Sequence, residues 1–205
     1  MKYLTARIAI HAAYLTGEKG MDPAKLKEGF GGTLTDRDWR IVDHVEKGFI
    51  QKAMDNLKQR EPVLYAWNLF AYAPPGTGHG FERSRLLQWM LDKYSSETGE
   101  QALLEPRLPM LARVAMQEYS IVDRSGKQGR RIPYSDFERL LGLGSGEYKA
   151  GSRWHRAYWK FYDYCKSLPE DSLPPIARVI GMMVDCSEGD AEAHLRLQRE
   201  LGVVA

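Results

Sequence analysis

Cysteine is scarce in this 205-residue sequence, which contains only Cys165 and Cys186. Two thiols cannot build a disulfide framework, and they are too few for a four-thiolate zinc site. Long hydrophobic runs are missing too, because no apolar stretch approaches the ~18 residues of a membrane-spanning helix. The first residues also lack the apolar core and cleavage site of a secretory signal. We therefore expect a cytoplasmic protein without a membrane partner.

Patterns typical of strands and of catalytic sites are also rare. The best strand signal, residues 119–122, is too short to seed a sheet. The segment at 73–80 has the proline and glycine content of a phosphate loop, but His79 and Gly80 stand where that loop needs lysine and Ser/Thr. The histidines do not pair at metal-ligand spacing on one helical face. We expect no enzyme, no cofactor and no metal, although a triad assembled only in space stays open.

Helical periodicity is present almost everywhere. Apolar residues recur at steps of three and four from Trp39 to Leu57, after the candidate N-cap Thr35 and before Pro62. Similar spacing along the rest of the chain predicts an all-α protein, a multi-helix bundle. The proline and glycine residues near 74–80 indicate a boundary between an N-terminal helical region, 1–73, and a C-terminal helical region, 81–205.

The formal net charge of +2 conceals an uneven distribution. Residues 1–106 are neutral, residues 107–166 carry 12 basic against 6 acidic residues, and residues 167–205 carry 3 against 7. A basic middle indicates a surface that meets an anion such as nucleic acid. An ordinary solvated surface is the alternative.

The basic surplus is concentrated in residues 124–168. A loop holds four basic residues in eight, and a short helix from Tyr134 is followed by a glycine-rich turn and a second helix from Lys149. Four cations of that second helix are spaced i, i+4, i+7 and i+11, within about 60° of arc, opposite an apolar stripe that includes Trp154 and Phe161. The predicted DNA-binding residues are Lys127, Arg130 and Arg131 of the loop with Lys149, Arg153, Arg156 and Lys160 of the helix.

A short helix, a glycine turn and a longer helix with a basic face form a helix-turn-helix-like pair, at about 134–168. The second helix would then enter the major groove of double-stranded DNA. Two features depart from that motif: the predicted loop 143–148 exceeds three or four residues, and Glu138 stands where tight packing favours a small residue. RNA or another phosphate-rich partner, and an amphipathic helix that meets only water, remain alternatives.

The segment 154–162, Trp-His-Arg-Ala-Tyr-Trp-Lys-Phe-Tyr, is followed at 168–175 by Leu-Pro-Glu-Asp-Ser-Leu-Pro-Pro. The block Tyr134–Leu168, with this core and the segment that follows it, resembles phage and prophage late-gene antitermination proteins of the Q type. Two cysteines restrict the resemblance to a branch without a zinc cluster. The resemblance implies a phage-type transcription regulator that acts in a bacterial host. Such a factor would bind DNA near the late promoter, load onto bacterial RNA polymerase and help it pass terminators.

A different class of function explains the same sequence without nucleic acid. The protein would be an adaptor or an inhibitor of a host enzyme, with aromatic side chains as interface anchors. The anchors would be Trp67, Phe70, Tyr72 and Trp159.

Overall fold

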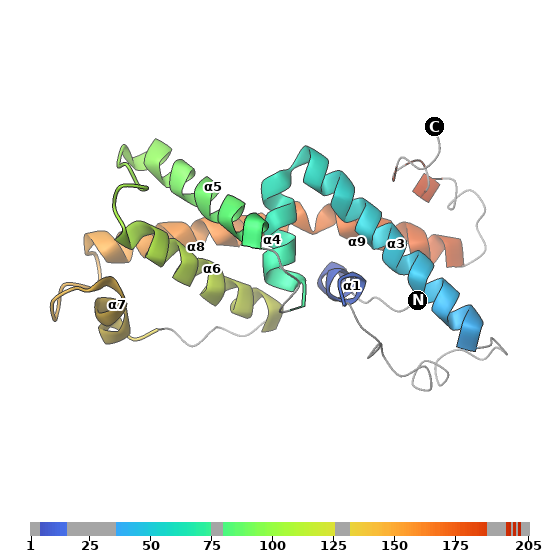
Figure 1. Cartoon of the computed structure of the whole chain (residues 1–205), viewed down its shortest axis with the longest axis horizontal. Helices are drawn as coiled ribbons and strands as arrows, with labels where there is room; N and C mark the ends of the chain where they lie inside the picture. Colours follow the sequence, from blue (N-terminus) through green and yellow to red (C-terminus); the bar gives the residue numbers. More distant parts are fainter. Residues whose placement is uncertain are drawn as a thin grey trace. The chain divides into compact units, whose positions relative to one another are not determined.

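The computed structural model describes residues 5–15, 36–74, 80–125 and 132–187, together with 196, 197, 199 and 201. The described residues form helices joined by loops and contain no strand, so the predicted all-α class is confirmed (Figure 1). The short segment 119–122 continues a helix. None of the described helices combines the length and the hydropathy that a membrane span requires.

The chain divides into two compact units. Unit 1 contains Met1–Tyr65, Tyr72–Gly78 and Leu173–Ala205, and unit 2 contains Ala66–Ala71 and His79–Ser172. This division differs from a boundary at 74–80 alone, because the chain from Leu173 onward belongs with the N-terminal helices. Helix α9 (Pro174–Ser187) contacts α3 (Asp36–Arg60). The local proline and glycine content near 74–80 could not predict a contact between helices so far apart in the sequence.

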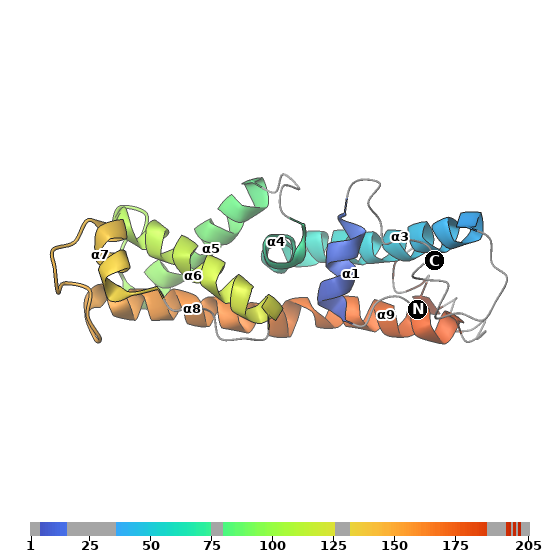
Figure 2. The same cartoon turned by 90° about the horizontal axis from the view of Figure 1, so that it is seen from below.

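Unit 1 is built on amphipathic helices with matching apolar stripes. In α3 the buried residues Ile50, Met54 and Leu57 follow the predicted spacing, and α9 buries Ile176 and Met183. Helix α1 (Ala6–Ala13) contacts both α3 and α9 and lies across them in Figure 2. The long helix predicted from the spacing of residues 39–57 is therefore confirmed.

Unit 2 contains α5 (Gly80–Thr98), α6 (Arg107–Ser125), α7 (Tyr134–Leu141) and α8 (Arg153–Ser172), with residues 66–71 of α4 (Pro62–Tyr72). Helices α6 and α8 pack along each other, and α5 contacts both. The core of this unit is rich in aromatic and aliphatic side chains. It includes Trp67, Leu86, Met90, Tyr94, Leu108, Leu111, Met116, Tyr158, Phe161, Cys165 and Leu168.

The segment between α7 and α8 is ordered by specific contacts. Gly142 ends α7 in the left-handed region, at φ 61°, which glycine adopts without strain. The Glu138 carboxylate accepts hydrogen bonds from the backbone N–H groups of Gly146 (2.6 Å) and Tyr148 (3.2 Å). Glu138 is therefore the residue that holds this loop in place, a role that a small residue would leave empty.

Helix α8 begins four residues later than predicted. Gly151 has φ +77°, and the hydroxyl of Ser152 accepts a hydrogen bond from the backbone N–H of His155 at 3.3 Å. These two residues form the start signal of the helix. Lys149 consequently lies in the loop, and the prediction that it belongs to the helical stripe is wrong.

Candidate nucleic-acid interface

The predicted DNA-binding residues divide into three groups in the structure. Arg153, Arg156 and Lys160 lie on α8, and Lys149 lies in the loop that precedes it. The loop cations Lys127, Arg130 and Arg131 lie outside the described residues. We use the name cationic face for the exposed surface around Lys149, Arg153 and Arg156.

Arg153 is held by carboxylates from the turn between α5 and α6. Its guanidinium group lies 2.8 Å from a carboxylate oxygen of Glu100 and 3.9 Å from one of Glu105. The hydrogen bond to Glu100 raises the pKa of Arg153 further above its usual range. Because all three side chains are partly exposed, this pairing contributes at most ~1 kcal/mol, and a phosphate could replace the carboxylates.

Lys160 has a carboxylate partner as well. Its ammonium group lies 3.0 Å from Glu97, and the Tyr164 hydroxyl donates to the same carboxylate at 2.7 Å. The Tyr164 and Lys160 hydrogen bonds together lower the pKa of Glu97 below its usual value. Glu97 therefore stays charged at neutral pH, and the contact is lost only as the pH falls through that lowered pKa.

Arg156 and Lys149 have no carboxylate partner among the described residues. Arg156 donates from its guanidinium group to the carbonyl oxygen of Gly151 at 2.6 Å, which fixes the side chain against the loop. Lys149 is exposed and forms no hydrogen bond or ion pair with the described part of the chain. These are the cations of this region that an anion could reach without first displacing a carboxylate.

Glu118 of α6 holds the backbone of Ile132, just before α7. The Glu118 carboxylate accepts a hydrogen bond from the backbone N–H of Ile132 at 3.1 Å and a second one from the hydroxyl of Tyr158. Burial, together with the Glu118 hydrogen bond, raises the pKa of Tyr158. Tyr158 therefore stays protonated and keeps donating at neutral pH. Glu118 thus fixes the backbone two residues before α7 begins at Tyr134.

Helices α7 and α8 meet through aromatic side chains. The rings of Phe137 and Tyr158 pack edge to face with centroids 4.9 Å apart, and Phe137 stacks on Tyr148 at 4.4 Å. The connection runs through residues 142–152, far longer than the three- or four-residue turn of a helix-turn-helix. An ordered loop and the start of α8 are therefore exposed on the pair of helices α7 and α8. That these helices bind DNA as a helix-turn-helix stays a prediction.

Trp154 is not a core residue, although the apolar stripe predicted from the sequence includes it. Its side chain is half-buried, and its ring lies beneath two guanidinium groups, those of Arg153 (4.6 Å) and Arg107 (5.3 Å). The buried stripe of α8 instead follows residues such as Ala157, Phe161 and Cys165, and α8 packs against α6 and α5. Burial raises the pKa of the Cys165 thiol, which remains protonated.

The anchors expected for an adaptor are only partly accessible. Trp67 is fully buried and Tyr72 is 2% exposed, so neither is available to a partner. Phe70 and Trp159 are half-buried. Larger apolar exposure occurs outside the predicted anchors, at Leu103 (57%) and Leu104 (76%) in the turn between α5 and α6.

Neutralising Glu100 should increase the affinity for duplex DNA if Arg153 contacts phosphate. Glu100→Gln removes the carboxylate that competes for the guanidinium group, so we expect binding about two- to fivefold tighter, the equivalent of one exposed ion pair. Fluorescence anisotropy at low salt measures this change. Glu170→Gln, at the other end of α8, removes the same charge from an exposed position and serves as the control. An equal increase in DNA affinity in both variants would show that the affinity depends only on the net charge of the protein.

No protein-family model matches this chain, and no curated protein or solved structure is significantly similar to it.

Proposed function

We propose that this protein binds duplex DNA through the cationic face and regulates transcription. One observation carries the proposal: Lys149 and Arg156 are exposed and lack a carboxylate partner among the described residues. Lys149 directly follows the loop that Glu138 holds, and Arg156 lies on α8 and donates to the carbonyl oxygen of Gly151. Because the backbone that carries both cations is already ordered, phosphate binding there does not require the entropic cost of ordering a loop. The three cations at 126–131 extend the same charge along the sequence.

The proposal assigns different roles to the cations of α8 and its preceding loop. Lys149 and Arg156 contact phosphates directly, whereas Arg153 and Lys160 contribute only after they release Glu100 and Glu97. Phosphate contact fixes the position of the protein on DNA, and base recognition would come from the first turn of α8. The contact surface is the loop and the helix start rather than the length of the helix.

Salt-dependent DNA binding tests these roles. Lys149→Ala with Arg156→Ala should make the log–log salt dependence shallower by about 1.8, at about 0.9 per phosphate contact. Arg153→Ala with Lys160→Ala removes the same charge from paired cations and should have the smaller effect. Lys52→Ala, on an exposed position of α3, should bind as the unaltered protein does. Equal affinity and slope in all variants would remove this surface from the proposal.

Late-gene antitermination is the specific form of regulation that we propose, and its support is the resemblance of the block Tyr134–Leu168 and the segment after it to the Q-type proteins. In that role the protein acts in the cytoplasm of a bacterial host. It binds RNA polymerase through a surface other than the cationic face. A purified transcription reaction tests it. Read-through of a terminator should rise when the protein is present and the template carries the cognate promoter. Unchanged read-through together with DNA binding would leave a repressor or activator.

The exposed pair Leu103 and Leu104 favours a second candidate, an adaptor or inhibitor that contacts a protein and no nucleic acid. Two adjacent leucines that are more than half exposed form an apolar contact point. The carboxylates of Glu97 and Glu100, which neutralise two of the predicted DNA contacts, agree with this candidate. Absence of binding to random duplex DNA at low salt would favour it.

A further inference from the structure

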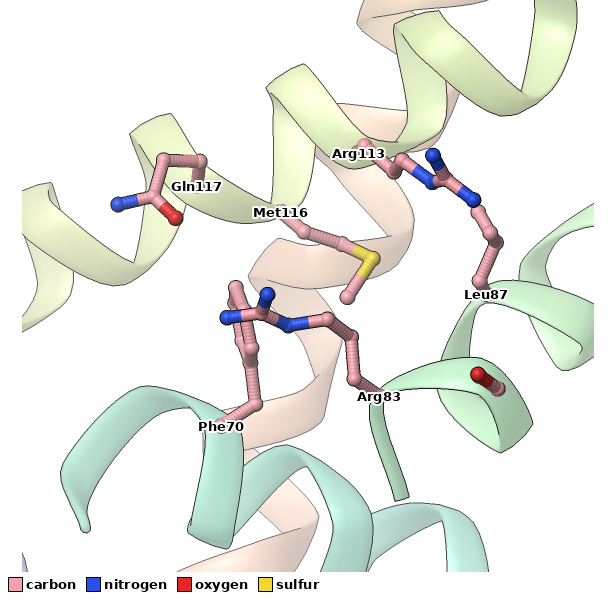
Figure 3. Close-up of a pocket in the computed structure, with 7 residues that line it drawn as sticks. Phe70, Arg83, Leu87, Arg113, Met116 and Gln117 are labelled. Atoms are coloured by element: carbon pink, nitrogen blue, oxygen red, sulfur yellow. The ribbon is translucent and has the colours of Figure 1, made fainter. Parts of the chain in front are cut away.

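A pocket with a volume of about 200 Å³ lies between α4, α5 and α6 of unit 2 (Figure 3). Two arginines lie at its edges, and no acidic residue is among those that line it. The lining residues are Phe70, Arg83, Ser84, Leu87, Arg113, Met116 and Gln117.

The floor of the pocket is apolar and its cations are accessible. Met116 is 1% exposed, and in Figure 3 its side chain lies between the two arginines. The guanidinium group of Arg83 lies 5.2 Å from the centre of the Phe70 ring, and Arg113 reaches toward Leu87. Arg113 is exposed and forms no hydrogen bond or ion pair with the described residues. Stacking on Phe70 positions Arg83 but leaves its N–H edge free to bind an anion.

Helical spacing explains why the side chains that line the pocket lie close together. Arg83 and Leu87 are four residues apart on α5, and Arg113, Met116 and Gln117 are spaced i, i+3 and i+4 on α6. Such positions share one helical face. Because α5 packs against α6, the two faces meet over the apolar side chains.

We propose that this pocket binds a small organic anion, an apolar ring that carries one carboxylate or phosphate group. The ring would lie over Met116 and Phe70, and the anionic group would accept hydrogen bonds from Arg83 and Arg113. Drug-sized ligands occupy pockets of about 300–1,000 Å³, so a pocket of about 200 Å³ admits a single ring. The missing carboxylates distinguish this pair of arginines from Arg153, which already has anionic partners.

The pocket is separate from the cationic face. Arg83 stands at the start of α5, whereas Glu100, the partner of Arg153, follows the end of the same helix. The fifteen helical steps from Arg83 to Thr98, at 1.5 Å per residue, span about 22 Å along that axis. The anion site therefore does not depend on the proposed DNA binding, and either proposal can fail alone.

Titration of the full chain with benzoate and with phenyl phosphate tests the site. We expect both to bind and to shift the side-chain NMR signals of Arg83 and Arg113. Arg83→Gln with Arg113→Gln should weaken binding at least about tenfold, the loss of one charge-assisted contact or more. Arg85→Gln is the matched control, because Arg85 lies on the same helix against the Phe81 ring, at 5.0 Å, and does not line the pocket.

Three results would overturn the proposal. Equal affinity of the double variant and the Arg85 control would show that the two arginines do not bind the anion. Equal binding of benzyl alcohol would show that charge plays no part, and inorganic phosphate binding as tightly as phenyl phosphate would show that the apolar floor plays none. A preference between benzoate and phenyl phosphate identifies whether a carboxylate or a phosphate ester is the natural group.

Discussion

Replacing Lys127, Arg130 and Arg131 together with alanine should cause the largest loss of DNA affinity of any change outside the core. Each lysine or arginine that neutralises a phosphate releases counterions, so the log–log dependence of affinity on salt should become shallower by about 2.7. The loss should be nearly the same for every DNA sequence, because phosphate contacts carry no base information. Anisotropy titrations over a range of salt concentrations measure both effects.

The loop supplies its own control for this experiment. Gln128→Ala changes the same segment without changing its charge, and it should leave both the affinity and the salt dependence unaltered. The triple variant should retain its far-ultraviolet helix signal, since the contacts that anchor the loop end come from Glu118 and the backbone of Ile132. A triple variant with the salt dependence of the Gln128 control would exclude the loop from the interface.

The regular part of the fold is predictable from the sequence because it rests on local spacing. Residues 50, 54 and 57 repeat at helical steps, and the structure buries all three on α3. The start of α8 is local too: Gly151 and Ser152 form a glycine and N-cap signal, which the basic spacing from Lys149 obscured. Where two local patterns overlap, the capping residues are the better guide to a helix boundary.

The pairing of the α8 cations is not predictable in this way. Arg153 meets Glu100, 53 residues earlier, and Lys160 meets Glu97, on a helix separated from α8 by α6 and α7. The basic surplus of residues 107–166 is therefore partly balanced in space by carboxylates from a neutral stretch. A charge count along the chain measures composition, whereas an anion responds to the charges that lie together on the surface.

The arginine pocket could not be predicted from the sequence either. Arg83 and Arg113 belong to separate helices and to no motif, so their convergence depends on how α5 packs against α6. Glu118 belongs to no sequence pattern, and Glu138 stands out only as a departure from the helix-turn-helix motif, although each holds a backbone segment through hydrogen bonds. Such roles arise from tertiary packing, which single-sequence periodicity does not encode.

The largest change in stability should come from Phe161→Ala. Phe161 is fully buried on α8, and its ring lies 5.0 Å from that of Tyr94 and 6.2 Å from that of Tyr164. Truncation removes the buried ring and leaves a cavity among close-packed helices, so the free energy of unfolding should fall by about 3–5 kcal/mol. Urea denaturation followed by far-ultraviolet circular dichroism measures this loss.

Trp154→Ala is the comparison that tests the observed packing against the predicted stripe. If Trp154 were a core residue, its truncation would cost about 3–5 kcal/mol as well. Because its half-buried ring mainly supports Arg153 and Arg107, we expect about 1 kcal/mol, the value of exposed cation–π contacts. Equal losses in the two variants would place Trp154 in the core. A small loss would instead place Trp154 at the edge of α8, against the guanidinium groups of Arg153 and Arg107, and leave Phe161 as the core aromatic residue beside Tyr94 of α5.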